Sequence, residues 1–453
     1  MSRSQPTRIV ILGGGFGGLA AARELERLLP ARANVEVTLV NRENFFLFTP
    51  MLHEVAASDL DLATIVSPLR RLLRRTRLFI GVVENVDVDA QTVTVAHAGG
   101  QHRHELPYDH LVVALGAVTN FYDIPGLADR ASTMKSLGDA IQLRNQLIAQ
   151  LEEADFECAG EERRPLLTVL VAGGGFAGVE TVAAVNDFVR EAVRFYPNIT
   201  QQDVRVAVVH AGSYLLPELG QSLGTYTQAR LAERGVDVIL NTRVAGFDGD
   251  RTVLSSGERI DARTIVWTAG ISANPLLDCL PCERSRGRIV VNSYLQSASL
   301  PNVWAVGDCA SIMDPATGET YPPTAQHALR EGTHVARNIV AELTGAPKAA
   351  FSFSTIGLLA AIGRRTGVAN ILGLKFSGFI AWWLWRTVYL AKLPRLEKKV
   401  RVALDWTLDM IFAKDLVQFG TQRAPAISRQ ETLALVRDEP AHASGTISAA
   451  ARI

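Results

Sequence analysis

The sequence of 453 residues has few cysteines and no long apolar run. Four cysteines in so long a chain do not form a disulfide framework, so we expect a reducing compartment. The richest apolar stretch, 376–385, has only 10 residues, whereas a membrane-spanning helix needs about 20. Lysine plus arginine equals aspartate plus glutamate at 46 each, so no overall charge favours nucleic acid as a partner. The first strand-like run begins at Arg8, which leaves no room for a signal peptide, and we expect synthesis in the cytoplasm.

Motifs for nucleophilic, phosphoryl-transfer and metal chemistry are also missing. The sequence contains no Gly-x-Ser-x-Gly, no Gly-x-x-x-x-Gly-Lys and no His-Glu-x-x-His. Cys279 and Cys282 form a Cys-x-x-Cys, but neither a helix start nor a second ligand pair accompanies it, so we interpret this segment as a connector. We therefore predict no metal site and assign the chemistry to bound cofactors.

What the sequence does contain is one glycine-rich turn in two near-copies. Each copy follows an apolar run (8–12 and 167–172) and precedes an alanine-rich helical stretch. In such a turn the first glycine makes the bend, the second lets a pyrophosphate approach, and the third lets helix and strand pack closely. The glycines are Gly13, Gly15 and Gly18 in the first copy and Gly173, Gly175 and Gly178 in the second. Two copies in the same context favour two dinucleotide sites over turns that serve packing alone.

The repeat extends over whole domains. Each turn is followed by a further strand (35–40 and 204–210) and later by an apolar strand that ends near Gly116 or Gly270. A final apolar strand leads to Asp308, at the edge where open α/β sheets bind ligands, although this aspartate could instead cap the next helix. We predict an α/β protein with two Rossmann-like dinucleotide-binding domains, the second inserted into the first. The predicted parts are 1–150 and 291–350 for the first domain, 151–290 for the second, 351–427 for a C-terminal membrane-associating region and 428–453 for a flexible tail.

The C-terminal part has an unusual composition. Four of the six tryptophans, Trp382, Trp383, Trp385 and Trp406, lie among lysines and arginines. Tryptophan with basic residues is typical of a helix that lies in a membrane interface. We therefore predict that 376–412 contacts a membrane surface. A homodimer interface or ordinary core packing is the alternative.

These motifs together resemble those of one family. GGGFGGL, LFTPMLHEVA, GGGFAGVE, WTAG, AVGDCA and TAQHALREG are similar to segments of type II NADH dehydrogenases, the single-subunit NADH:quinone oxidoreductases that pump no protons. The resemblance covers about residues 8–420. It implies bound FAD, NADH as donor, a quinone as acceptor and a peripheral position on the cytoplasmic face of the cell membrane. A reductase with a different acceptor, such as a disulfide or ferredoxin-type enzyme, and a flavin-bearing NADH sensor stay open as alternatives.

The resemblance also implies site residues. Glu180 would be the catalytic carboxyl beside nicotinamide and flavin, although the residues alone allow it merely to offset its helix dipole. Gln326 and Arg330 would contact the quinone, in a motif that Gly332 closes. The FAD site would comprise Gly13, Gly15, Phe16, Gly17, Gly18, Asn41, Arg42, Val83, Gly116, Asp308, Ala325 and Gln326. The nicotinamide nucleotide site would comprise Gly173, Gly175, Phe176, Ala177, Gly178, His210 and Gly270.

Three positions depart from the family pattern. Asn41 and His210 stand where an acidic residue usually contacts the ribose of FAD and NADH. Without a carboxylate at His210, NADPH is repelled less, yet no arginine follows it, so we predict that NADH is preferred and NADPH stays open. Arg330 stands where a second glutamine is usual, and because arginine has no acceptor, the quinone could be bonded differently or the acceptor could differ.

Overall fold

The computed structural model describes residues 5–97, 102–157 and 159–420. Residues Met1–Val417 form one compact unit. The predicted flexible tail, 428–453, lies outside the described residues.

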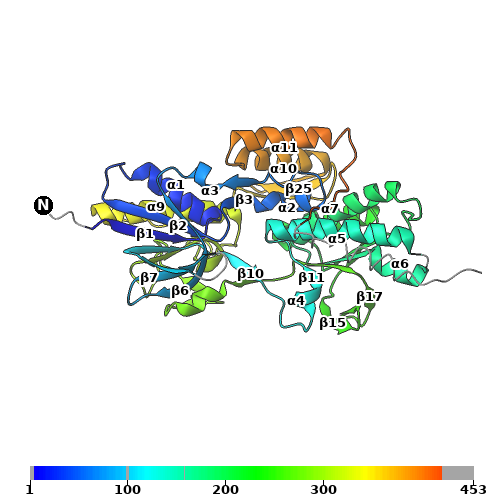
Figure 1. Ribbon diagram of the computed structural model, residues 1–453, viewed down its shortest axis with the longest axis horizontal. Helices are drawn as coiled ribbons and strands as arrows, with labels where there is room; N and C mark the ends of the chain where they lie inside the picture. The colour runs from blue at the N-terminus through cyan, green and yellow to red at the C-terminus, as the bar shows by residue number, and fades with distance from the viewer. Residues whose placement is uncertain (1–4, 98–101, 158, 421–453) are drawn as a thin grey trace, which may run out of the picture. The chain divides into compact units, whose positions relative to one another are not determined.

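The first sheet has 5 strands in the order β22-β9-β1-β2-β5, all parallel (Figure 1). The strands are β1 (Thr7–Leu12), β2 (Val35–Asn41), β5 (Arg77–Ile80), β9 (His110–Val113) and β22 (Val303–Ala305). Helix α1 (Phe16–Leu28) packs on β1 and β2, and α9 (Ala325–Thr344) packs against α1. The strands that we predicted at 8–12 and 35–40 are confirmed to within one residue.

The second sheet repeats this plan in the order β11-β18-β12-β13-β14. Its strands are β11 (Ala131–Ser132), β12 (Thr168–Ala172), β13 (Arg205–Val209), β14 (Val236–Ile239) and β18 (Thr264–Trp267). Its helices are α5 (Leu137–Phe156), α6 (Gly160–Leu166), α7 (Phe176–Ala192) and α8 (Gln221–Glu233). The chain completes this sheet before β22 returns to the first one, as an inserted unit requires. β11, which precedes the predicted boundary at 151, pairs with β18 of this sheet, and the domain boundaries stay a prediction.

Short strands accompany the two sheets, and they pair in antiparallel fashion except β21 with β23, which are parallel. Three of them form the sheet β6-β7-β8, with β6 (Val82–Asp87), β7 (Thr92–Ala96) and β8 (Arg103–Pro107). A second such sheet consists of β15 (Val244–Asp248), β16 (Arg251–Leu254) and β17 (Arg259–Asp261), and a third of β20 (Arg284–Ser285), β21 (Arg288–Val290) and β23 (Ala310–Ser311). Two further sheets are pairs, β3 (Phe45–Leu47) with β4 (Val66–Pro68) and β10 (Ala117–Thr119) with β19 (Ile271–Ala273). Short helices are α2 (Leu52–Ala56), α3 (Leu69–Leu72) and α4 (Leu127–Arg130).

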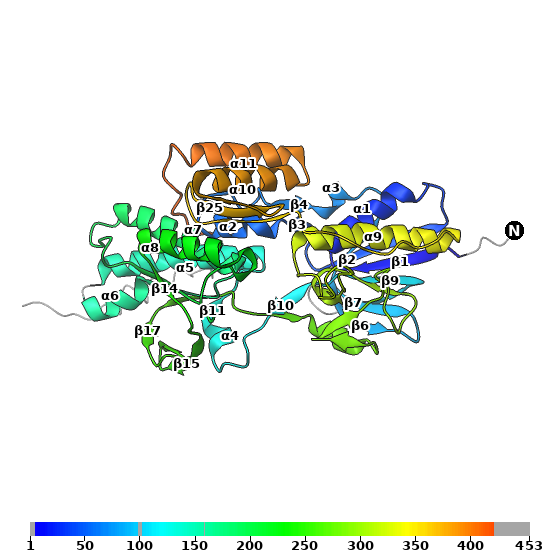
Figure 2. The same ribbon diagram turned by 180° about the vertical axis from the view of Figure 1, so that it is seen from behind.

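The C-terminal region is a small sheet followed by two helices. Its elements are β24 (Gly357–Ala361), β25 (Gly367–Ile371), β26 (Leu374–Ser377), α10 (Gly378–Lys392) and α11 (Leu396–Leu408). Figure 2 shows α11 lying along α10, which itself packs on β25. Among the residues that the structure describes, every helix is too short or too polar to cross a bilayer.

The tryptophans of this region do not share one environment. Trp385 and Trp406 are buried, whereas Trp383 is 55% exposed. For the two buried rings, the alternative of core packing therefore holds, and they cannot lie at a membrane surface. Composition alone did not separate them, because the separation depends on which helix face turns inward.

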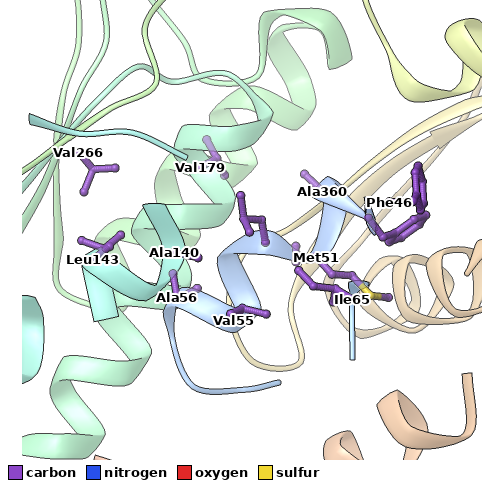
Figure 3. Packing of buried hydrophobic residues seen from close by; sticks show 14 of the residues in the cluster. Phe46, Met51, Val55, Ala56, Ile65, Ala140, Leu143, Val179, Val266 and Ala360 are labelled. Carbon is purple, nitrogen blue, oxygen red and sulfur yellow. The ribbon is translucent and has the colours of Figure 1, made fainter. Parts of the chain in front are cut away.

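Helix α2 joins the two halves of the core. It packs against α5 and α7 of the second unit, although it belongs to the first part of the chain. Figure 3 shows Val55 and Ala56 of α2 beside Ala140 of α5, with Met51 and Ile65 packed next to them. This packing places the side chains of α2 next to the cavity described below.

Candidate active site

The two glycine turns have the same backbone geometry. Gly13 and Gly173 have φ values of +102° and +116°, which residues with a side chain rarely adopt. A methyl group at Gly18 would come within 1.8 Å of the Gly13 carbonyl oxygen, and one at Gly178 would come equally close, 1.8 Å, to the oxygen of Gly173. Each helix therefore lies as close to its strand as the motif predicts.

The middle of each turn is open. A methyl group at Gly15 would meet nothing within 4 Å, and one at Gly175 would meet only a Glu218 oxygen at 4.0 Å. These two glycines are the N-caps of α1 and α7, and no side chain caps either helix. The first N–H groups of both helices are thus available to a pyrophosphate, so both turns fit a dinucleotide.

Each turn is braced by a residue at the end of the next strand, Asn41 as the last residue of β2 and His210 directly after β13. Asn41 Oδ1 accepts the Gly14 N–H at 2.7 Å, and His210 Nδ1 accepts the Gly174 N–H at 3.1 Å. An accepting Nδ1 leaves the ring proton on Nε2, and burial lowers the pKa of His210, so this histidine is neutral at pH 7. Asn41 and His210, which both depart from the family pattern, therefore occupy equivalent places, and each accepts a hydrogen bond from its glycine turn.

A cavity of about 500 Å³, hereafter the central cavity, lies where three helices begin. Helices α1, α7 and α9 all direct their N-termini at it, and none has a side-chain cap. Unpaired N–H groups and helix dipoles favour electron-rich oxygen atoms there. The predicted site residues on its wall are Phe16, Phe176, Ala177, Glu180, Gly270, Asp308, Ala325 and Gln326.

Several predicted residues lie away from this cavity. Arg330 places its guanidinium 4.2 Å from the centre of the Phe353 ring and donates to the Gln326 carbonyl at 3.3 Å. The structure therefore brings Arg330 to the backbone of Gln326 and not to the cavity wall. Arg42 is exposed and pairs with Glu43 at 3.3 Å. Two further predicted residues outside the lining are Val83, half-buried on β6, and Gly116, whose carbonyl accepts the Cys309 Sγ–H at 3.3 Å.

Glu180 is a buried carboxyl on the cavity wall. Its Oε1 accepts the Trp385 indole N–H at 2.9 Å and the Ala361 N–H at 3.2 Å. Burial raises the pKa of Glu180 to about 8 and lowers the pKa of His53, whose Nδ1 lies 3.8 Å from Oε2, to about 3. Both groups are therefore mostly uncharged at pH 7, and their contact is not an ion pair. The hydrogen bonds of Glu180 run to β24 and α10 and not to the start of its own helix. An interaction with the dipole of α7 therefore explains the position of this carboxyl less well.

Sequence reasoning missed part of the cavity wall. His53, Lys135, Tyr389 and Lys392 all line it. Burial lowers the pKa of Lys135, and the charge of nearby Asp308 opposes that shift. His53 belongs to the LFTPMLHEVA segment, which supported the resemblance without roles for its residues. Tyr389 and Lys392 lie in the segment that we interpreted only as a membrane contact.

Comparison with known proteins agrees with this geometry. Residues 7–332 match the pyridine nucleotide-disulphide oxidoreductase family, and residues 356–415 match the NDH2 C-terminal domain. The chain is 34% identical over 445 residues to the type II NADH:quinone oxidoreductase Ndh of Mycobacterium tuberculosis, covering 94% of this chain and 93% of that one. The chain belongs to the type II NADH dehydrogenase family. This type II NADH dehydrogenase is also 31% identical to the demethylphylloquinone reductase NdbB of Synechocystis, over 90% of this chain and 96% of the relative.

Solved structures share the fold at lower sequence identity. NDH2 from Plasmodium falciparum in complex with NADH superposes with a TM-score of 0.84 at 20% identity, over 91% of this chain and 99% of that one. The sulfide:quinone oxidoreductase of Aquifex aeolicus has a TM-score of 0.68 at 18% identity, over 92% of this chain and 100% of that one. These likenesses describe the fold of this type II NADH dehydrogenase.

The described cysteines lie away from the cavity wall. Cys279 is exposed, Cys282 is half-buried, and Cys309 is buried, which raises its pKa to about 12. None of these three is among the lining residues. In the described part of this type II NADH dehydrogenase, the lining of the central cavity therefore offers no thiol to a dithiol relay.

Proposed function

We propose that the protein is an FAD-dependent NADH:quinone oxidoreductase that pumps no protons. One observation carries this function: a single cavity receives the N-termini of the helices that follow both glycine turns, with a buried carboxyl between them. When bound, FAD accepts a hydride from NADH and passes two electrons to a quinone. Two relatives carry the names type II NADH:quinone oxidoreductase and demethylphylloquinone reductase, which supports the same donor and acceptor classes.

The chain's own residues would divide the work. The first glycine turn, braced by Asn41, would hold the FAD pyrophosphate, and Asp308 would bind the ribityl chain. The second turn, braced by His210, would hold NADH and release it after each turnover. Glu180 and the start of α9 at Gln326 would line the place where nicotinamide and quinone meet the flavin. In domain terms, 1–130 and 291–350 would carry FAD, and 131–290 would carry NADH.

Two separated half-reactions test this function. The purified flavin-loaded protein is mixed anaerobically with NADH, and loss of the flavin absorbance is followed. Soluble ubiquinone and menaquinone analogues are then added, and return of the absorbance is followed. Rapid loss and rapid return are expected. Loss of absorbance without quinone-dependent return would contradict the quinone part of the proposal, and absence of any loss would contradict the NADH part.

The nucleotide preference depends on His210. We expect the wild-type kcat/KM to be higher with NADH than with NADPH, because a neutral imidazole offers no cation to a 2′-phosphate. His210→Asp should raise the ratio of the two kcat/KM values by about tenfold, since a carboxylate bonds the ribose hydroxyls and repels the phosphate. Aspartate can still accept the Gly174 N–H, as Asn41 does at the equivalent place. Equal or higher wild-type kcat/KM with NADPH would contradict the assignment.

We also propose that α10 and α11 seat the enzyme on a membrane. The supporting observation is a set of exposed apolar side chains on these two helices and directly after α11. Large exposed apolar patches are unusual on proteins that contact only water. The set includes Phe379, Ile380, Trp383, Leu396, Val400, Leu404, Leu408, Met410, Ile411 and Phe412. Lysines and arginines along the same helices would contact anionic lipid headgroups. The cytoplasmic face and a homodimer stay predictions from the sequence.

Charged substitutions on this surface test the membrane proposal. Trp383→Asp combined with Leu404→Asp should lower the fraction of protein that sediments with anionic phospholipid vesicles by about tenfold, because two apolar contacts are replaced by charges. Phe195→Asp is the matched control, since Phe195 is 58% exposed but lies outside the C-terminal region. Unchanged sedimentation of the double variant would rule out this surface as the membrane contact.

A further inference from the structure

A second buried carboxyl, Glu54, lies behind the cavity wall and has no part in the function proposed so far. Glu54 belongs to α2. The residue before it in this helix, His53, lines the cavity. Its Oε2 accepts the Trp406 indole N–H at 3.1 Å. Glu54 itself is not among the lining residues, so it cannot contact a substrate directly.

Glu54 and Glu180 are held in the same manner. Trp385 of α10 donates to Glu180, and Trp406 of α11 donates to Glu54. The two indole rings lie 6.4 Å apart, and the His53 ring lies 5.6 Å from Trp385. Burial raises the pKa of each carboxyl to about 8, and the charge of Glu54 adds to the rise at Glu180. The fold thus keeps two mostly neutral carboxyls at pH 7, each bonded to one of two neighbouring tryptophans.

Charged groups surround Glu54 on the side away from the cavity. Arg386 of α10 lies 4.5 Å from the centre of the Trp406 ring, and its charge opposes the rise in the pKa of Glu54. Asp59 adds to the rise, while Lys414, which pairs with Asp59 at 2.6 Å, opposes it. The charge of Asp409 in turn raises the pKa of Asp59. Asp409 is bonded at 2.8 Å to Arg364, a residue on the wall of an open surface hollow. Ionisable groups therefore extend from the cavity wall to the surface.

We propose that Glu54 is a proton-holding group that restores the proton of Glu180 during quinone reduction. The inference rests on the proposed function. A quinone that becomes a quinol takes up two electrons and two protons, whereas the hydride of NADH carries two electrons and one proton, so one proton per turnover comes from water. Glu180 releases its proton to a quinone oxygen and becomes a carboxylate. Glu54 then gives its proton to Glu180 and regains one from water on the side of Arg386 and Asp59.

Glu54→Gln tests this proposal, because glutamine keeps an oxygen for Trp406 but carries no transferable proton. The rate of flavin reduction by NADH should stay within about twofold of wild type. The rate of quinone-dependent reoxidation should fall about tenfold or more, as is typical when a proton-transfer group is lost. In the wild type this rate should decline above pH 8, where both Glu54 and Glu180 lose their protons, and in the variant, where only Glu180 still titrates, the decline should be less steep. Glu54→Asp should restore part of the rate.

Trp406→Phe separates proton supply from packing. This variant loses the bond to Glu54 but keeps the carboxyl, so its reoxidation should stay closer to wild type than that of Glu54→Gln. Equal losses in both variants, without rescue by aspartate, would overturn the proposal in favour of a structural role. Normal reoxidation in a folded Glu54→Gln would also overturn it while leaving the proposed function intact. If Glu54→Gln does not fold, wild-type reoxidation in H2O and D2O from pH 6 to 10 decides, and a flat profile without an isotope effect would overturn it.

Discussion

Gly178→Ala should yield a flavin-loaded protein whose KM for NADH is raised about a hundredfold or more. The added methyl group would lie 1.8 Å from the Gly173 oxygen and 2.7 Å from Thr268 Oγ1, so α7 must move away from β12. That movement displaces the N–H groups that would bind the NADH pyrophosphate. A loss of about 3 kcal/mol of binding free energy corresponds to this change in KM. Steady-state kinetics, with the flavin content determined from absorbance, provide the measurement.

The equivalent change in the first turn is the matched comparison. Gly18→Ala creates the same 1.8 Å contact, with the Gly13 oxygen, and should yield protein with little bound flavin. Gly246→Ala is the neutral control, because a methyl group there meets nothing within 4 Å. If Gly178→Ala lost flavin while Gly18→Ala kept it, the assignment of the two turns would be reversed. If neither variant changed flavin content or KM, neither turn would be a dinucleotide site.

The elements of the two sheets could be predicted because their signals are local. An apolar run, a glycine that needs positive φ and an alanine-rich helix follow one another within about 20 residues in each copy. The same locality identified Asn41 and His210, since Asn41 ends β2 and His210 directly follows β13, the strands next to the two turns. The hydrogen bonds that these two side chains accept from Gly14 and Gly174 could not be predicted, because they depend on each side chain pointing toward the glycine turn and not toward the ribose.

The cavity's other wall could not be predicted, because its contacts are remote in sequence. Trp385 lies 205 positions from Glu180, and Trp406 lies 352 positions from Glu54. The composition of 376–412 was the available signal, and it indicated a membrane contact. The structure shows that α10 and α11 have two different faces: their inner tryptophans bond buried carboxyls, and their outer apolar residues are exposed. A sequence pattern that averages over both faces cannot separate these roles.

The segment after α11 should depend for its position on one buried ion pair. Lys414 Nζ lies 2.6 Å from Asp59 Oδ1 and donates to the Ala57 carbonyl at 3.1 Å, and the Lys414 side chain is 2% exposed. Lys414→Met should lower the free energy of unfolding by about 3–5 kcal/mol, because it leaves the Asp59 carboxylate buried without a partner. Urea unfolding of the flavin-loaded variant and wild type, followed by tryptophan fluorescence, provides the measurement.

The pH dependence and a double variant separate the lost pair from lost packing. Burial raises the pKa of Asp59, and the charge of Lys414 opposes that rise. Without Lys414 the pKa of Asp59 rises further, so the carboxyl takes up a proton as the pH falls. The destabilisation by Lys414→Met should therefore be largest at high pH and should shrink toward pH 5. Asp59→Asn combined with Lys414→Met should recover most of the loss at pH 8, since no buried charge remains. A loss that is independent of pH and unchanged in the double variant would mean that Lys414 acts through packing. Because the Asp59 N–H also donates to the Glu54 carbonyl at 2.8 Å, a true loss of the pair should loosen the turn that follows α2 and with it the carboxyls beside the cavity.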